Sequence, residues 1–361
     1  MTIALDATYS IGDELSGVGL YSREILYGLA AAHPKTRFEF CYRPHRYFRV
    51  RKQTLPPNVR RWLLWEGRGQ WSLSWRRSGF GSLPSAAHLF HGLNQRLPRH
   101  LPPHTAVTFH DLFVMTGDYS TPEFRARFTQ QARDAAARAD AIIAVSAFTK
   151  RQVVELLGVP SSKVHVVHHG TRCLAYPDVQ REKIVLSVGA IQTRKNTARL
   201  IEAFETLDSS WRLVLAGSAG FGAEPILARA ARNSRILVTG YVSPEILAAW
   251  YARAMIFAFP SLDEGFGMPV LEAMAIGTPV ITSNRSALPE VAGRAAILVD
   301  PEDSSALAEA LRQLAANEDL RRQYGERGIE RAREFTWGKA VRRTWDVYQM
   351  LLSGSLRRPQ S

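Results

Sequence analysis

The sequence has little cysteine, no long apolar run and no leader-like beginning. Its two cysteines among 361 residues, Cys41 and Cys173, are too few for a disulfide framework. No apolar run approaches the roughly 18 residues that a helix needs to cross a bilayer. Asp6 stands where the apolar core of a secretory signal would lie. These absences argue against disulfide scaffolds and membrane-spanning proteins, and we expect a cytoplasmic protein.

Several catalytic motifs are also missing. The chain has no H-E-x-x-H zinc motif, no P-loop lysine motif, no G-x-S-x-G nucleophile turn and no Asp-x-Asp pair. We therefore expect no bound metal and no resident cofactor. The composition, with 46% apolar and 22% charged residues, is that of an ordinary globular protein, and the length suggests two domains.

The positive charge is concentrated in one stretch. The chain carries a formal charge of +13, and residues 42–80 hold ten Lys and Arg against one acid, Glu66, with eight aromatic residues among them. Anionic lipid headgroups attract such cations, while tryptophan rings bury at the headgroup boundary. The alternatives are nucleic-acid binding and a solvated basic face whose tryptophans fill the local core. The composition leaves all three interpretations open.

Short β-branched runs alternate with helical segments along the chain. The runs are continuously apolar, as is typical of strands covered on both faces of a parallel sheet, and the alternation indicates an α/β architecture. The expected strands are 2–7, 88–91, 106–109, 141–145, 164–168, 184–188, 212–216, 235–239, 255–259, 279–282 and 295–299. The pattern lapses around 175–182, so we expect two α/β domains that join near residue 178. Ligands of such folds bind at the carboxyl ends of the strands.

One segment combines a strand end, a glycine turn and a helix start. Residues 259–272 read F-P-S-L-D-E-G-F-G-M-P-V-L-E, and Pro269 stands near the first position of the expected helix. Backbone amides at a helix start bind anions such as phosphate. Glu264 and Glu272 are each suited to accept two hydrogen bonds from a pair of sugar or ribose hydroxyls. The segment favours a nucleotide-sugar site, and the alternative is a plain turn with a solvated, helix-capping glutamate.

Three other segments follow expected strands. In 188–196, V-G-A-I-Q-T-R-K-N, Arg194 and Lys195 suit a diphosphate leaving group, or are two surface cations. The glycines in residues 17–19 allow a ligand to approach the backbone closely, or form only a turn. His110 ends an expected strand, where it either hydrogen-bonds a sugar hydroxyl or is a structural residue.

Taken together, these segments resemble the family 4 retaining glycosyltransferases, which have the GT-B fold of two Rossmann-like domains facing across a central cleft. The resemblance spans nearly the whole chain. Its most specific part is E-G-F-G-M-P-V-L-E at 264–272, which matches the family's Glu-x7-Glu signature. Further matches are V-G-x4-R-K-N at 188–196, S-G-V-G-x-Y at 16–21, H-x2-H-G at 88–92 and T-x-H-D-L at 108–112.

The resemblance implies a domain plan. Residues 1–178 would form an N-terminal acceptor-binding domain and residues 179–337 a C-terminal donor-binding domain, with a last helix at 338–356 crossing back to the first. Two positions depart from the family pattern. Ala190 stands where many members have arginine, and the common P-N-G ahead of the linker reads H-H-G at 168–170.

The resemblance also implies roles for individual residues. Glu264 would bind hydroxyls of the transferred sugar, and Glu272 would bind the ribose diol. Arg194 and Lys195 would bind the diphosphate, and His110 would lie over the donor sugar. The remaining donor contacts would be the amide of Val242 at the base, the amides of Gly265, Phe266 and Gly267 at the sugar and phosphate, and Gly17, Val18 and Gly19 at the diphosphate.

The implied reaction moves a hexose with retention at the anomeric carbon. The sequence nominates no carboxylate for a double displacement, so we expect a metal-independent, front-face mechanism. The R-K-N form resembles bacterial mannosyl-, rhamnosyl- and fucosyltransferases of surface polysaccharide assembly. GDP-mannose is therefore the expected donor, and a glycan or lipid-linked glycan is the expected acceptor. A UDP- or dTDP-sugar donor and a GT-B sugar-nucleotide epimerase are the alternatives.

The resemblance bears on the basic stretch as well. A lipid-linked acceptor would give residues 42–80 a purpose, because they could dock the enzyme on the inner face of the cell membrane. A nucleic-acid-binding module would leave the Glu-x7-Glu turn without a purpose. We therefore expect no nucleic-acid partner.

Overall fold

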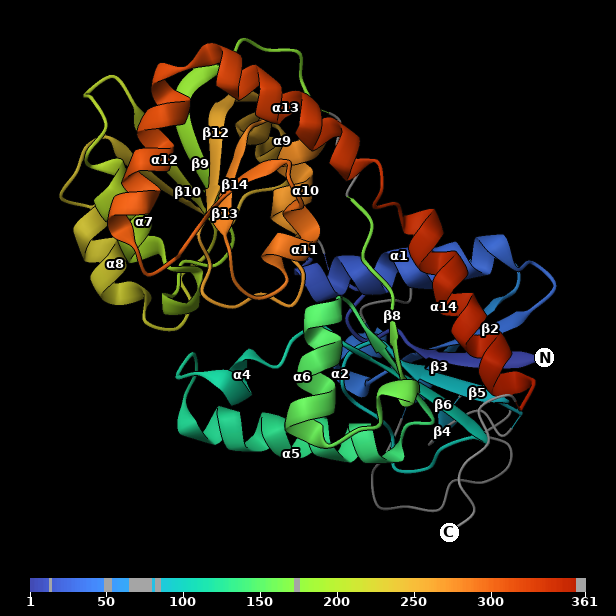
Figure 1. Cartoon of the computed structure of the whole chain (residues 1–361). Helices are drawn as coiled ribbons and strands as arrows, with labels where there is room; N and C mark the ends of the chain where they lie inside the picture. The colour runs from blue at the N-terminus through green and yellow to red at the C-terminus, as the bar shows by residue number, and fades with distance from the viewer. Residues whose placement is uncertain (13–14, 49–53, 65–79, 82–85, 172–175, 355–361) are drawn as a thin grey trace. The chain divides into compact units, whose positions relative to one another are not determined.

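The chain folds into two compact units (Figure 1). The computed structural model describes residues 1–12, 15–48, 54–64, 80–81, 86–171 and 176–354. The first unit contains Met1–Met115, Pro122–His169 and the chain from Trp337, and the second contains Thr116–Thr121 and Gly170–Thr336. The chain therefore passes from one unit to the other four times. The third passage, after His169, lies ahead of residue 178, where the sequence placed the boundary.

The first unit is built on a parallel sheet. Among the described residues the sheet has eight strands in the order β4-β3-β2-β1-β5-β6-β7-β8. The strands are β1 Thr2–Asp6, β2 Arg37–Tyr42, β3 Val59–Leu64, β4 Phe80–Gly81, β5 Leu89–Gly92, β6 His104–Phe109, β7 Ala141–Ala144 and β8 Val164–Val166. The helices are α1 Gly17–Ala32, α2 Pro44–Tyr47, α4 Phe113–Thr116, α5 Pro122–Arg138, α6 Ala147–Leu157 and α14 Trp337–Leu352.

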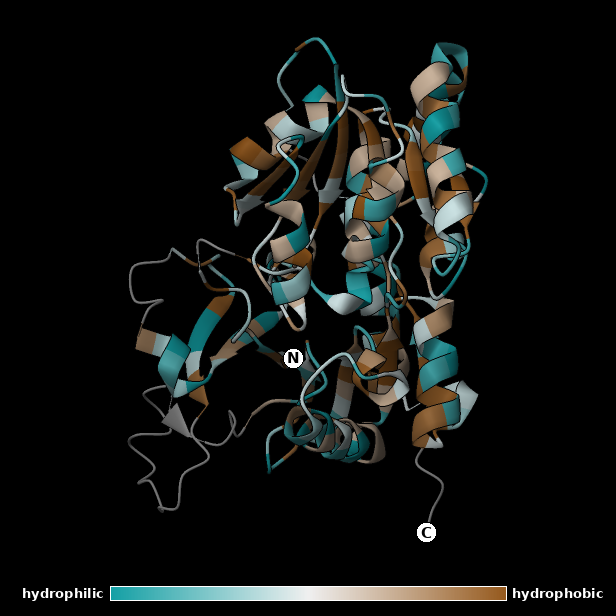
Figure 2. Ribbon diagram, turned by 90° about the vertical axis from the view of Figure 1, so that its left-hand side faces the viewer, coloured by the Kyte–Doolittle hydropathy of each residue, from teal (hydrophilic) through white to brown (hydrophobic). Residues whose placement is uncertain are grey.

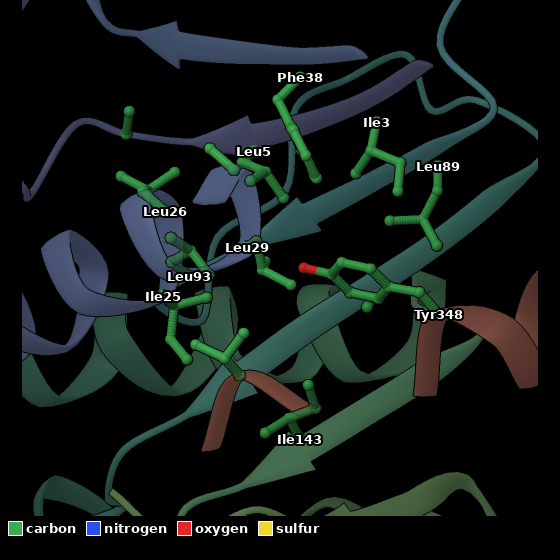
Figure 3. Close-up of a cluster of buried hydrophobic side chains, with 14 of the residues drawn as sticks. Ile3, Leu5, Ile25, Leu26, Leu29, Phe38, Leu89, Leu93, Ile143 and Tyr348 are labelled. Carbon is green, nitrogen blue, oxygen red and sulfur yellow. The ribbon is translucent and has the colours of Figure 1, made fainter. Parts of the chain in front are cut away.

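Helices cover both faces of this sheet. Ile3 and Leu5 of β1 pack in one cluster with residues of α1 and with Tyr348 of α14 (Figure 3). Ala4, which points to the opposite face because strand side chains alternate, packs with Trp62 of β3. Farther along that opposite face, alanines of α5 pack on β6 and β7. The last helix of the chain is therefore part of the core of the first unit.

Strands β2, β3 and β4 were absent from the sequence-based expectation, and this part of the prediction was wrong. β2 carries Glu39 within its apolar run, and β3 begins with two arginines after Val59, so neither run is continuously apolar. Glu39 is only 2% exposed and pairs with Arg37 at 3.0 Å. Trp62, in the basic stretch 42–80, is buried in the core. Residues 49–53 and 65–79 of that stretch lie outside the described residues.

The second unit is a smaller parallel sheet with helices on both faces. Its described strands follow the order β11-β10-β9-β12-β13-β14. They are β9 Glu182–Val188, β10 Arg212–Ala216, β11 Ile236–Gly240, β12 Ala254–Phe259, β13 Val280–Ser283 and β14 Ala296–Val299. The helices are α7 Thr197–Phe204, α8 Ala223–Ala230, α9 Pro244–Arg253, α10 Met268–Ala275, α11 Leu288–Ala292, α12 Ser304–Ala316 and α13 Glu318–Ala332.

Hydropathy explains the layering of this unit. Figure 2 shows strands that are largely apolar between helices that alternate apolar and polar residues. Helices α7, α8 and α12 bury their apolar sides in one cluster on one face of the sheet. Across the ranges that the structure describes, no helix is both long and apolar enough to span a membrane.

Candidate functional site

The topology of the second sheet identifies where a ligand would bind. In the order β11-β10-β9-β12-β13-β14, successive strands are added on one side up to β11 and on the other side from β12. Doubly wound folds bind ligands at the carboxyl ends of the two strands where this reversal occurs, here β9 and β12. The loops that follow these strands are 189–196 and 260–267. They are the two segments that the sequence analysis singled out.

These loops bring two cations onto one carboxylate. The Nζ of Lys195 lies 2.5 Å from Oε1 of Glu264, and Nη1 of Arg194 lies 3.2 Å from the same oxygen. We call these three residues the cation–carboxylate cluster. Their side chains are 9% exposed for Arg194, 16% for Lys195 and 10% for Glu264. The sequence-predicted trio is therefore assembled at one point, largely shielded from water.

The cluster fixes the charge of its carboxylate. Burial alone would raise the pKa of Glu264, but the charges of Arg194 and Lys195, with the hydrogen bond that Lys195 donates, hold that pKa below its ordinary value. Glu264 is thus ionised near neutral pH. An ionised carboxylate only accepts hydrogen bonds, so Glu264 is suited to bind hydroxyl groups that donate them.

Backbone contacts hold the cations in place. Arg194 accepts a hydrogen bond from the amide of Leu262 through its carbonyl, and its guanidinium donates to the carbonyl of Asp263. Asn196, which has a left-handed φ of 58°, donates to the carbonyls of Pro260 at 3.1 Å and Pro301 at 2.6 Å. The ammonium of Lys195 lies 4.6 Å from the centre of the Phe259 ring. The loop after β9 is therefore tied directly to the loop after β12.

The turn at 264–267 is held from another strand end. The amide of Glu264 donates to Oγ of Ser286 at 3.1 Å, and its carbonyl accepts from the amide of Ala287 at 3.2 Å. Gly267 has a φ of +108°, and a Cβ there would lie 2.7 Å from Cδ2 of Leu288. Only glycine fits this position without a shift. The amides of Gly265, Phe266 and Gly267 consequently lie at the N-terminus of α10, where the sequence placed them.

Glu272 lies inside α10 and is 2% exposed. Its Oε2 accepts a hydrogen bond from the hydroxyl of Tyr251 at 2.8 Å, and its carbonyl accepts one from Tyr176 at 3.4 Å.

Val242 follows β11 and precedes Ser243, whose hydroxyl caps α9. An isolated bridge pairs Gly217 with Gly240, which brings the ends of β10 and β11 together near Val242.

His110 belongs to the first unit, at the end of β6. It is 8% exposed, and burial lowers its pKa to about 4, although its bond to the carbonyl of Leu93 opposes that shift. The imidazole is therefore neutral at pH 7. Its Nε2 lies 2.9 Å from the Leu93 carbonyl oxygen, which accepts, so Nε2 carries the hydrogen and Nδ1 is left as an acceptor. His110 can thus take a hydrogen bond from a hydroxyl but does not act as a cation.

The surroundings of His110 are aromatic. The ring of Tyr21 lies edge-on at 4.8 Å from His110, and His169 stacks on His110 at 5.5 Å. His169, one of the two histidines that replace the family's P-N, is 4% exposed. Gly17, Val18 and Gly19 are the first three residues of α1, and Ser16 caps that helix by accepting from the amide of Gly19. Within the described residues, no set of three His, Cys, Asp or Glu side chains is placed to hold a metal ion.

Comparisons with known proteins match both halves of the chain. A model of "Glycosyltransferase Family 4" matches residues 16–173, and a model of "Glycosyl transferases group 1" matches residues 176–331. The chain belongs to the family 4 glycosyltransferases. The expected family, the α/β GT-B fold with two Rossmann-like units and the assignment as a glycosyltransferase are thereby confirmed.

Relatives and solved structures agree with this assignment. The glycosyltransferase is 29% identical to O-antigen chain mannosyltransferase B of Escherichia coli over 299 residues, 76% of this chain and 78% of that protein. It is 28% identical over 277 residues to the serotype-specific mannosyltransferase WbdA of E. coli, where the match covers 70% of this chain and 34% of the relative. Sucrose-phosphate synthase from Thermosynechococcus elongatus superposes with a TM-score of 0.76 at 23% identity, covering 98% of this chain and 99% of that one.

Some site residues of this glycosyltransferase were missed from the sequence. Tyr251 holds Glu272, Ser286 holds the amide of Glu264, and Thr116 donates to Oδ2 of Asp263 at 2.8 Å. Ser286 has a left-handed φ of 59°. Serine rarely adopts this conformation, so the sequence does not predict it. Asp263, next to Glu264 in a predicted site, is the one of these residues that sequence reasoning had grounds to consider.

The buried histidines of the glycosyltransferase predict a loss of stability in acid. Burial lowers the pKa of His91 to about 3, whereas an unfolded histidine titrates near 6.5. The unfolded chain therefore binds the proton first, and the free energy of unfolding should fall below about pH 6.5 by about 1.4 kcal/mol per pH unit for each such histidine. His110 and His169 shift in the same direction.

Urea unfolding at about pH 7, 6 and 5 would measure this slope, in a range where Glu264 stays ionised. The variant His91→Gln should reduce the slope between about pH 6 and 5 by about 1.4 kcal/mol per pH unit. His100→Gln, at an exposed position, is the matched control. An unchanged slope in His91→Gln would contradict the prediction.

Proposed function

We propose that this protein is a retaining mannosyltransferase that uses GDP-mannose and extends a glycan, carried on a lipid, in bacterial surface polysaccharide assembly. The observation that carries the donor site is the cation–carboxylate cluster at the strand reversal of the second sheet. The similarity to O-antigen chain mannosyltransferase B supports mannose as the sugar and a polysaccharide as the acceptor. A UDP- or dTDP-sugar is the alternative donor.

In the proposed reaction, Lys195 and Glu264 of the cluster have different tasks. The bond between the anomeric carbon and the phosphate oxygen of the donor breaks, and a bond from the same face forms to an acceptor hydroxyl oxygen. The acceptor proton passes to the departing phosphate oxygen. Lys195 and the amides at the start of α10 stabilise the negative charge that grows on the diphosphate, while Glu264 binds sugar hydroxyls and Glu272 binds the ribose diol. His110 accepts a hydrogen bond from a donor hydroxyl at Nδ1.

A thermal-shift panel tests the donor. We would measure the unfolding midpoint with GDP, UDP, dTDP, ADP and GDP-mannose, first without metal and then with magnesium. A ligand that binds only the folded state at a hundredfold excess over its dissociation constant adds about 2.7 kcal/mol of stability. We expect GDP and GDP-mannose to raise the midpoint in the absence of metal. A shift with UDP or dTDP alone would show that the donor is a UDP- or dTDP-sugar and not GDP-mannose. No shift with any nucleotide would overturn the proposal. GDP-mannose consumed without an acceptor would instead indicate an epimerase.

We also propose that the enzyme acts in the cytoplasm and docks on the inner face of the cell membrane through residues 42–80. Ten cations in this stretch, with the six aromatic residues other than Tyr42 and Trp62, which are buried in the core, support the proposal. Exposed charge attraction weakens as salt shortens the Debye length. Anionic liposomes should therefore pull the protein down at low salt and release it at high salt.

The matched variants for this test replace equal numbers of arginines. Arg76→Ser with Arg77→Ser, inside the stretch, should weaken the pull-down. Arg322→Ser with Arg333→Ser, at exposed positions of the second unit, should leave it unchanged. A pull-down that ignores ionic strength, or none at all, would count against membrane docking.

A further inference from the structure

A short segment of the N-terminal half of the chain is built into the second unit. Residues Thr116–Thr121 belong to the second unit, although Met115 before them and Pro122 after them belong to the first. The segment reads T-G-D-Y-S-T, and it runs from the last residue of α4 to the residue before α5. The chain thus leaves the first unit and returns to it within six residues, and we ask what these six residues do in the second unit.

The segment contacts the residue that precedes the predicted sugar-binding glutamate. Oγ1 of Thr116 donates a hydrogen bond to Oδ2 of Asp263 at 2.8 Å, and Asp263 is only 7% exposed. The carbonyl of the same aspartate accepts from Arg194, which also pairs with Glu264. The side chain and the backbone of Asp263 are thus both anchored, and Glu264 follows it directly.

The ring of a tyrosine in the same segment lies against the backbone of that segment. A Cβ on Gly117 would lie 2.5 Å from Cε2 of Tyr119, so the absence of a side chain at Gly117 lets the Tyr119 ring lie against the backbone. Burial, and then the charge of Asp263, raise the pKa of Tyr119, while Arg194 opposes the shift. The Tyr119 phenol therefore lies within electrostatic reach of the same aspartate and arginine.

The anchors of residues 263 and 264 come from different parts of the chain. Arg194, Lys195, Ser286 and Ala287 are all within the contiguous stretch 170–336. Thr116 comes from outside that stretch. We propose that Thr116 is a positioning residue of the donor site, which fixes the place of Glu264 through Asp263 and thereby adjusts recognition of the transferred sugar. This inference rests on the proposed function, because it takes Glu264 to bind the sugar hydroxyls.

The proposal predicts a split between two ligands. GDP carries the groups assigned to Lys195 and Glu272 but no sugar, whereas GDP-mannose also engages Glu264. Thr116→Val keeps the shape of the side chain and removes the hydroxyl. It should weaken GDP-mannose binding about tenfold, because a displaced Glu264 would lose about one hydrogen bond from a sugar hydroxyl to its charged oxygen, and should change GDP binding less than twofold. Thr116→Ser, which restores a hydroxyl, should bind both ligands as the unaltered chain does.

Isothermal titration of the full chain with GDP and with GDP-mannose provides the measurement. Thr129→Val, which removes a threonine hydroxyl from α5, is the control and should leave both affinities unchanged. In an Asp263→Ala background, Thr116→Val should have no further effect, because neighbours that act through one contact are not additive. Equal losses for GDP and GDP-mannose, or no loss for either, would overturn the positioning role. An unaltered chain that binds neither ligand would overturn the proposed donor and this inference with it.

Discussion

Replacing Lys195 by alanine should lower kcat by about 100- to 1,000-fold, the range seen when one preorganised group that stabilises transition-state charge is removed. The Nζ of Lys195 is held 2.5 Å from Glu264 and against the Phe259 ring, so it is positioned before any ligand arrives. Charge that grows on a departing diphosphate would meet an ammonium that needs no rearrangement. Because the side chain is only 16% exposed, water screens this attraction weakly.

Glu264→Gln should produce a loss of similar size for a different reason. The amide keeps the shape of the side chain but can no longer accept hydrogen bonds at both atoms, and it leaves Arg194 and Lys195 without their charge partner. Initial rates with the donor that the thermal-shift panel identifies would measure both variants. Lys183→Ala alters a lysine of β9 that bonds Ser210 on the exposed side of the unit, and serves as the control. Near-normal turnover in both Lys195→Ala and Glu264→Gln would refute the assignment of the site.

Tyr348→Ala should cost about 3–5 kcal/mol of unfolding free energy, because it removes a large, fully buried ring from the core of the first unit. Figure 3 shows the ring among Leu5, Leu29 and Leu89, which come from β1, α1 and β5. Its hydroxyl lies 2.6 Å from Nδ1 of His91. α14 therefore fastens onto the sheet through packing and through a polar contact together.

The two contributions are separable. Tyr348→Phe keeps the ring and removes only the hydroxyl, so it should cost less, about 1–2 kcal/mol, for the broken hydrogen bond to His91. Gln349→Ala, at the next and exposed position of the same helix, should change the unfolding free energy by less than about 0.5 kcal/mol. Urea unfolding curves of the three variants would decide. A Tyr348→Ala variant as stable as Gln349→Ala would show that α14 is not part of the folded core.

The site residues that the sequence predicted are those whose chemistry is local. Glu264 lies in a turn after β12 whose glycine and proline mark a strand-to-helix passage, and Lys195 follows β9, the neighbour of β12 in the sheet. Their meeting followed from topology, because adjacent parallel strands end at one edge of the sheet. The partner of Glu272 did not follow, because Tyr251 lies in another helix, α9, 21 residues before it.

The fold was predicted less completely in its first unit. An α/β fold was evident from the apolar runs, but a buried charge such as Glu39 breaks the pattern that identifies an inner strand. Its partner Arg37 stands on the same strand two residues away, so the sequence holds both members of the pair without marking them as buried. The contact of Thr116 with Asp263 could not be predicted from local sequence either, since 147 positions separate the two residues.

The four passages of the chain between the units bear on how this enzyme could exchange parts with its relatives. The third and fourth passages, at 169/170 and 336/337, lie close together, because the amide of Thr171 donates to the carbonyl of Phe335. A gene fragment cut at these two points would carry residues 170–336 as a transferable module. It would leave Thr116–Thr121 behind. Recombination at 169/170 and 336/337 would therefore combine residues 170–336 of one parent with residues 116–121 of the other. Hybrids that also exchange residues 116–121 should have the higher transferase activity.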